Sequence, residues 1–201
     1  MLEPKVLLFD EPLSNLDAKL RRQVREDIRD LQQKVGLTTI YVTHDQEDAL
    51  AISDKIIVMN NAVIAQEGTP KDLYTFPETS FVANFIGDSN IVKAKIINKE
   101  DNCYQIQLGE IEITLTSNFN LQNYASVAIR SEAIKIEPEK KSNSIVARII
   151  KASYVGNNYQ YTVSSSLGEL YFVSEDVVNY HEPGSEIYLT FKKYGLNILS
   201  D

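Results

Sequence analysis

Two adjacent carboxylates and a histidine are the residues of this chain best suited to chemistry. Asp10 and Glu11 follow the apolar run 6–9, and His44 follows the run 38–43, which is rich in β-branched residues. Carboxylates at the end of a buried strand are costly unless a positive charge lies opposite them. In phosphoryl-transfer sites that charge is Mg²⁺ bridging nucleotide phosphates. Asp-Glu-Pro is also ordinary turn chemistry, so a plain turn remains an alternative on the tripeptide alone.

The elements that must position these residues follow from the apolar spacing. The wholly apolar run 6–9 predicts a strand buried on both faces of a parallel sheet, and 38–43 predicts a second buried strand. Between them, apolar residues spaced three and four apart predict an amphipathic helix over 17–35, with Asp17 as its N-cap and Gly36 just past its end. Two adjacent parallel strands could bring His44 within reach of the γ-phosphate of a nucleotide held by Asp10 and Glu11. A lone histidine at a strand end is more often structural, so that reading stays open on His44 alone.

The rest of residues 1–87 continues the same alternation of strands and helices. A short helix is predicted over 45–52, a strand pair over 55–59 and 62–66 around Asn60-Asn61, and a helix that begins at Thr69-Pro70. One more helical piece is expected over 80–86, closed by Gly87. We therefore predict an α/β domain over residues 1–87.

Residues 88–201 have a different pattern, in which short alternating runs are separated by turn residues. This pattern predicts an all-β domain, a small barrel or a sandwich, with the break at 138–143 allowing two unequal halves. The expected strands are 91–97, 104–108, 111–115, 125–129, 145–150, 159–163, 170–173 and 187–191.

Composition narrows the classes of function. The 201 residues carry a net charge of −8, which gives no support to binding of nucleic acid or of anionic membrane surfaces. The single cysteine, Cys103, excludes an internal disulfide and suits a reducing compartment. No apolar run approaches the ~20 residues of a membrane helix. The first five residues do not have the pattern of a signal peptide, so a cytoplasmic location is expected.

Five segments together resemble a known family. Residues 7–21 are similar to the Walker B strand and D-loop of ABC transporter ATPases, and residues 41–50 to their switch-histidine segment. The stretches 54–61, 66–70 and 81–87 resemble the later segments of that domain in importers that carry a C-terminal module. The resemblance implies that Asp10 helps hold Mg²⁺, that Glu11 is the general base, and that His44 senses the γ-phosphate. It places Asp17 in the loop that contacts the opposite subunit, beside the nucleotide.

The implied fold is an α/β C-terminal remnant of a P-loop ATPase domain over 1–87, followed by an all-β TOBE-like barrel of the OB type over 88–201. The resemblance implies a homodimer, bound to membrane-spanning permease subunits at the inner face of the cell membrane. Residues 85–92 are closer to polyamine and ferric-iron importers than to sugar importers. ATP and Mg²⁺ are the expected cofactors of the full-length parent.

The printed sequence contains neither a Gly-x-x-x-x-Gly-Lys-Ser/Thr loop nor a Leu-Ser-Gly-Gly-Gln signature. Backbone amides of such a loop and its lysine bind the triphosphate, so we expect this chain alone neither to bind nucleotide tightly nor to hydrolyse ATP. We expect it to act in dimerisation and regulation. The alternatives are a stand-alone module that senses a small solute at the β domain, an ATPase completed by a separate chain, and a structural fragment without activity.

Overall fold

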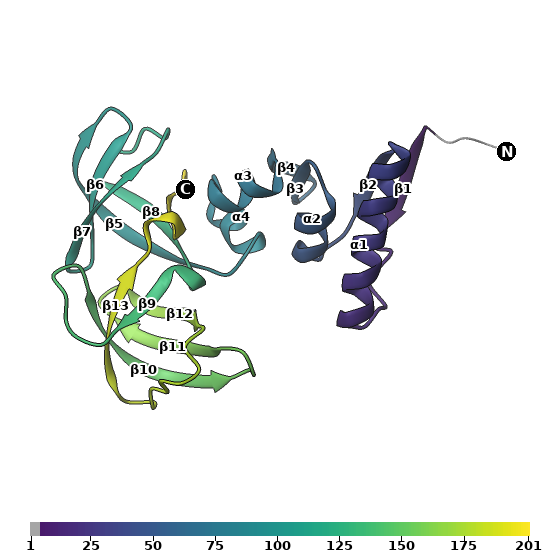
Figure 1. Cartoon of the computed structure of the whole chain (residues 1–201). Helices are drawn as coiled ribbons and strands as arrows, with labels where there is room; N and C mark the ends of the chain where they lie inside the picture. The colour runs from purple at the N-terminus through teal and green to yellow at the C-terminus, as the bar shows by residue number, and fades with distance from the viewer. Residues whose placement is uncertain (1–4) are drawn as a thin grey trace. The chain divides into compact units, whose positions relative to one another are not determined.

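The structure is a computed structural model that describes residues 5–201. Residues 1–4, on which the expectation about a signal peptide largely rests, lie outside the described residues. The chain divides into two compact units, one ending at Tyr74 and the other beginning at Thr75 (Figure 1). Each unit is described by itself.

The first unit alternates strands and helices. Its elements are β1 (Val6–Asp10), α1 (Ala18–Val35), β2 (Thr38–Val42), α2 (Gln46–Ile52), β3 (Ile56–Asn60), β4 (Val63–Gly68) and α3 (Pro70–Thr75), the last of which ends at the division. Strands β1 and β2 are parallel neighbours, paired from Val6 with Thr38 to Asp10 with Val42. The expectation that the two strands present their carboxyl ends at one edge is therefore confirmed.

The predicted limits of α1 are also confirmed. The Asp17 carboxylate accepts hydrogen bonds from the backbone N–H groups of Lys19 and Leu20, both at 3.1 Å. Gly36 ends the helix in the left-handed conformation, with φ 69°, and its N–H donates to the Gln32 carbonyl. Glycine adopts this conformation without the steric cost that a Cβ imposes.

The prediction that β1 and β2 are buried on both faces is wrong for the described residues. Alternate residues of a strand face opposite sides, and Leu8 and Ile40 are cross-strand partners on one face. This face is exposed: 68% of the Leu8 surface is accessible, and Val6 and Val42 are also exposed. Helix α1 has the predicted apolar stripe but no buried residue. The reason is that the β1–β2 sheet has only two strands in the part of the chain described.

The remainder of the first unit forms a hairpin and a short helix. Strands β3 and β4 pair antiparallel, and the turn between them lies at Asn61 and Ala62, one residue later than predicted. Helix α3 begins as expected, because the Asp72 N–H donates to Thr69 Oγ1 at 3.2 Å. The buried apolar side chains among the described residues of this unit are Leu13, Ile52, Ile56, Val58 and Leu73.

The second unit contains two antiparallel five-stranded sheets, with strand orders β14-β8-β5-β6-β7 and β12-β11-β10-β13-β9. Its elements are α4 (Ser80–Phe85), β5 (Ser89–Glu100), β6 (Cys103–Leu108), β7 (Ile111–Thr116), β8 (Tyr124–Arg130), η1 (Ser131–Ala133), β9 (Ile134–Glu137), β10 (Ile145–Tyr154), β11 (Tyr159–Ser165), β12 (Gly168–Ser174), β13 (Glu186–Phe191), η2 (Lys193–Gly195) and β14 (Leu196–Ile198). The expectation of a second half built from β strands is confirmed. Two unequal halves divided at 138–143 are not found: each sheet has five strands, β9 precedes that break but pairs in the sheet of β10–β13, and β14 pairs in the sheet of β5–β8. The sequence missed the short strands β9 and β14.

Both sheets contribute to one apolar core. Side chains such as Ile106 and Val127 from one sheet and Val163, Leu170 and Phe172 from the other belong to a single cluster of buried residues. Alternation along the strands places these residues on the inner faces and polar residues outside. The second unit therefore has a closed core of its own.

Helix α4 belongs to this second unit, although the sequence placed residues 75–87 in the first domain. Ala83 packs against Ala128 and Leu199, and its carbonyl accepts a hydrogen bond from Arg130 Nη1 at 2.7 Å. At its N-terminus, the Ser80 N–H donates to the Asp201 carboxylate at 3.0 Å. The division into compact units thus lies between Tyr74 and Thr75, ahead of residue 87. The boundary between domains at 87/88 stays a prediction.

Two further features concern membrane-spanning helices and the single cysteine. None of the helices in residues 5–201 is both long enough and apolar enough to cross a membrane. Cys103 is exposed and is not in a disulfide.

Candidate functional site

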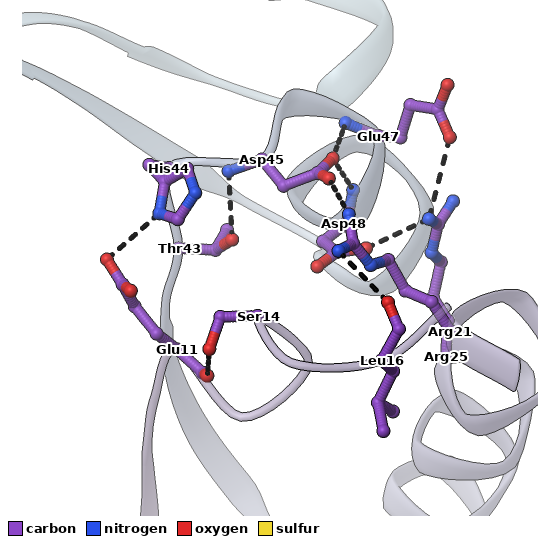
Figure 2. A network of polar contacts seen from close by, with 10 residues as sticks. All are labelled: Glu11, Ser14, Leu16, Arg21, Arg25, Thr43, His44, Asp45, Glu47 and Asp48. Carbon is purple, nitrogen blue, oxygen red and sulfur yellow. Dashed lines mark hydrogen bonds and ion pairs between the residues drawn. The ribbon is translucent and has the colours of Figure 1, made fainter. Parts of the chain in front are cut away.

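The candidate site lies where β1 and β2 end together (Figure 2). The Glu11 N–H donates to the Val42 carbonyl at 2.9 Å, which extends the pairing of the two strands by one residue. Asp10 is the last residue of β1, and His44 follows the end of β2 by two residues. Asp10, Glu11 and His44 are therefore held at one edge of the sheet.

Glu11 and His44 are in direct contact. His44 Nδ1 lies 3.0 Å from Glu11 Oε1, with 72% of the His44 side chain and 48% of the Glu11 side chain exposed. The hydrogen bond to the Glu11 carboxylate, together with its negative charge, raises the pKa of His44 above its ordinary value. The residues sit 33 positions apart in the sequence, so only the pairing of the strands brings them together.

The backbone of Glu11 is in an unusual conformation. Its φ is +45°, in the left-handed region that residues other than glycine, asparagine and aspartate rarely adopt. Such conformations are costly and are concentrated at functional sites, where the surrounding structure maintains them. Here the flanking hydrogen bonds to β2 and to Ser14 hold Glu11 in place. Nothing in the residue type could have signalled this strain from the sequence.

The loop 11–17, which joins β1 to α1, is held by its own hydrogen bonds. Ser14 donates to the Glu11 carbonyl through Oγ at 3.0 Å, and the Leu16 N–H donates to the Leu13 carbonyl at 3.2 Å. Leu13 is buried and anchors the loop. Asp17 ends the loop as the N-cap of α1, so its carboxylate is occupied by backbone N–H groups. Its expected place beside a nucleotide stays a prediction.

The turn that carries His44 is held by Asp45. Asp45 Oδ1 accepts from the N–H groups of Glu47 at 2.9 Å and Asp48 at 3.2 Å, and so caps α2. The Asp45 N–H donates to Thr43 Oγ1 at 3.0 Å. Burial of Asp45 opposes its ionisation, but the two backbone donors and the charge of Arg21 outweigh it and keep the pKa of Asp45 below its ordinary value. His44 thus lies in a turn between β2 and α2 that these hydrogen bonds hold.

A row of three arginines on α1 contacts α2 and the residues that flank it, and the sequence analysis missed this row. Arg21 pairs with Asp45 at 2.6 Å, Arg25 with Asp48 at 2.9 Å, and Arg29 with Asp54 at 2.5 Å. Asp48 is buried, and this burial raises its pKa. The signal available in the sequence was the spacing of four between successive arginines, which places them on one helix face.

The donor chemistry at the edge suits Mg²⁺. This ion is bound in proteins by one or two carboxylates and fills its remaining positions with water and phosphate oxygens. Asp10 and Glu11 supply carboxylate oxygens, and Asp10 is exposed. Within residues 5–201, no group of three or more histidine, cysteine, aspartate or glutamate side chains is placed to hold a metal by protein ligands alone. The residues therefore fit a magnesium ion that arrives with phosphate, and not a closed protein cage.

Comparisons with known proteins show what the chain is similar to. Residues 127–197 match the TOBE domain family. The chain is 40% identical over 199 residues to the Fe(3+) ions import ATP-binding protein FbpC of Agrobacterium fabrum. The matched region covers 99% of this chain and 56% of that protein. It is 40% identical over 200 residues to the protein of the same name from Rhizobium etli, and 39% identical over 202 residues to that from Escherichia coli O157:H7.

The chain spans little more than half the length of these curated relatives. Among solved structures, the cytoplasmic molybdate-binding protein ModG with molybdate bound is similar with a TM-score of 0.46 and 13% identity, over 56% of this chain and 96% of that one. Over nearly its whole length the chain is similar to the C-terminal part of ABC importer ATP-binding subunits. Within it, residues 127–197 form part of a TOBE domain.

Proposed function

We propose that this chain supplies the water-activating and γ-phosphate-sensing half of the ATPase site of a ferric-iron importer, together with its TOBE domain. The observation that carries the proposal is the contact of Glu11 with His44 at the carboxyl edge of β1 and β2. The similarity to ferric-iron import proteins over the whole chain supports the choice of solute over a polyamine.

The roles of the residues follow from their chemistry. Bound Mg²⁺ with ATP supplies the charge that polarises the transferring phosphoryl group. The exposed Asp10 carboxylate would hold that ion, and Glu11 would accept a proton from the attacking water. His44 Nδ1 donates to the Glu11 carboxylate, so Nε2 would donate to a γ-phosphate oxygen when the imidazole ring is protonated. Asp17 keeps the loop 11–17 attached to α1 for contact with a second subunit.

The exposed face of β1 and β2 gives independent support. A two-stranded parallel sheet with a solvent-facing leucine is unlike parallel sheets in general, which are covered on both faces. The P-loop part of an ATPase domain, which the curated relatives have the additional length to contain, would extend and cover such a sheet. In the assembled importer, the chain would work as a dimer against membrane permease subunits at the cytoplasmic face.

ATP hydrolysis is tested with a chimera. The part of the Agrobacterium fabrum relative that precedes the matched region is joined to this chain, and ATP turnover is measured. We expect turnover that falls at least about a hundredfold with Glu11→Gln, because a general base contributes about 10² to 10⁴ in rate. The matched control is Glu26→Gln, on the exposed side of α1. Undiminished turnover in the Glu11→Gln chimera would refute the proposed role.

The solute and the native size are tested in the source cells. An antibody against residues 88–201 measures the native polypeptide, and a band well above 22.7 kDa identifies this sequence as part of a longer subunit. Disruption of the gene should reduce uptake of radiolabelled ferric iron and leave uptake of labelled spermidine unchanged. Loss of spermidine uptake with normal iron uptake would contradict the ferric-iron assignment.

A further inference from the structure

Arg21 contacts two segments that are far apart in the sequence. Its Nη1 donates to Asp45 Oδ2 at 2.6 Å, and its Nη2 donates to the Leu16 carbonyl at 3.3 Å (Figure 2). Leu16 belongs to the loop 11–17, and Asp45 is the neighbour of His44. The guanidinium therefore lies between the loop after β1 and the turn after β2.

These contacts close a ring. From Leu16 the ring passes through the hydrogen bond to the Leu13 carbonyl, along the chain to Ser14, and through the Ser14 hydroxyl to the Glu11 carbonyl. It continues from the Glu11 carboxylate to His44, along the chain to Asp45, and from the Asp45 carboxylate back to Arg21. Each hydrogen bond in the ring is 3.3 Å or shorter. A displacement of one residue of the ring therefore strains its hydrogen bonds with the others.

The chemistry of the two side chains fits this position. Asp45 uses Oδ1 to cap α2 and leaves Oδ2 for Arg21, so one carboxylate orients the helix and binds the cation. A guanidinium presents several donors in a fixed planar fork and can bind two acceptors in different directions. A lysine at position 21 could keep the charge but would not reproduce the fork.

The two other arginines of the row provide an internal comparison. Arg25 contacts Asp48 and Glu47, which lie within α2. Arg29 contacts the Ile52 carbonyl and Asp54, at the far end of α2. Both hold the body of α2 against α1, whereas Arg21 also holds the loop 11–17.

The geometry points to Arg21 as a positioning residue that locks the loop 11–17 to the His44 turn and so keeps Glu11 opposite His44. The significance of this lock for catalysis rests on the proposed function, in which Glu11 and His44 act on ATP. The positioning of the loop 11–17 by Arg21 does not depend on that function, because it consists of contacts within this chain. Through these contacts, a displacement of the loop 11–17 by a second subunit would be transmitted to His44.

The test reads the ring signals of His44 by NMR in the 201-residue chain, without nucleotide. The chain has two histidines, so His44→Asn assigns the signals and His181 serves as an internal reference. Glu11→Gln defines the ring ¹⁵N and ¹H shifts that result from loss of the carboxylate. Arg21→Gln should move the His44 signals toward those values, and Arg21→Lys should move them part of the way. Arg29→Gln, which removes the same charge and also weakens the contact of α1 with α2, should leave them in place.

A double variant completes the design. If Arg21 acts through the Glu11–His44 contact, Arg21→Gln combined with Glu11→Gln should give the same His44 shifts as Glu11→Gln alone. Unchanged His44 signals in both Arg21→Gln and Arg21→Lys, or effects of the two substitutions that simply add, would overturn the inference. Arg21→Lys keeps the charge and the helix propensity, so it decides the matter if Arg21→Gln unfolds the first unit. A failure of ATP turnover in the chimera would refute the proposed function and leave this result unaffected.

Discussion

The two units of this chain differ in how completely they enclose a core. In the second unit, two five-stranded sheets share one buried cluster. In the first unit, the β1–β2 sheet exposes Leu8 and Ile40, and α1 exposes Leu20 and Leu31. An amphipathic strand or helix is therefore buried only where another surface of the protein can pack against its apolar side. The second unit covers its apolar faces with its own residues. Among the residues described, the first unit covers them only in part.

The backbone strain at Glu11 fits this contrast. In the first unit, Glu11 has a positive φ and contacts His44 at the edge of an open sheet. The strained residue therefore lies in the unit whose apolar faces are only partly covered, and not in the unit with the closed core.

The largest effect is expected from truncation of a leucine in each unit. Leu170→Ala removes a side chain with 0% exposure from the core of the second unit and should lower its free energy of unfolding by about 2 to 5 kcal/mol. Leu8→Ala, at the exposed face of the first unit, should change stability by no more than about 0.5 kcal/mol in the isolated chain. Urea denaturation followed by circular dichroism measures both. A cost for Leu8→Ala as large as for Leu170→Ala would mean that the β1–β2 face is covered in solution.

A smaller effect is expected from adding a methyl group at a glycine of each unit. A Cβ at Gly195 would lie 2.1 Å from the Ala133 Cβ, so Gly195→Ala should destabilise the second unit by about 1 to 3 kcal/mol. At Gly68 the nearest atom, the Asp72 Cβ, would be 3.4 Å away, and Gly68→Ala should be close to neutral. Thermal unfolding of the two variants compares them. Equal melting temperatures would contradict the close packing of η1 against η2.

The strain at Glu11 predicts a stabilising substitution. Glu11→Gly should raise the stability of the first unit by about 1 kcal/mol, because glycine adopts a positive φ without a steric penalty. Glu11→Ala removes the same carboxylate but keeps the Cβ, and is therefore the matched control. Amide hydrogen exchange in β1 and β2 reports the difference. Equal protection in the two variants would show that the backbone is relaxed at this position.

The smallest effect is the pH dependence of the Glu11–His44 pair. Since the carboxylate raises the pKa of His44, any stabilisation from the pair is fully present below the ordinary histidine pKa and is lost as the pH rises through the raised value. Both side chains are exposed, so the effect should weaken with added salt. An NMR titration of His44 should give a pKa above 6.5 that falls in Glu11→Gln. A pKa that does not respond to Glu11→Gln would exclude the pair in solution.

Local rules predicted much of the first unit and of the second. The spacing of Leu20, Val24 and Ile28 predicted α1, Asp17 and Gly36 predicted its ends, and strand alternation predicted most of the β strands. The three-residue strand β14 was missed because its pairing with β8 is decided by partners far away in the sequence. The burial of β1 was predicted wrongly for a related reason. An apolar run shows which side chains a strand can bury, but it does not show which other elements are present to cover them.

The candidate catalytic residues and the helices and strands that carry them could be predicted from the sequence, because residue type, helical period and capping act over a few neighbouring positions. Tertiary contacts were needed to show that Glu11 contacts His44, that Glu11 has a positive φ, and that Arg21 joins Asp45 to Leu16. They were also needed to show that α4 packs on the β unit. These features depend on pairs of residues brought together by strand pairing and helix packing, and no local propensity encodes which distant partner a side chain will meet.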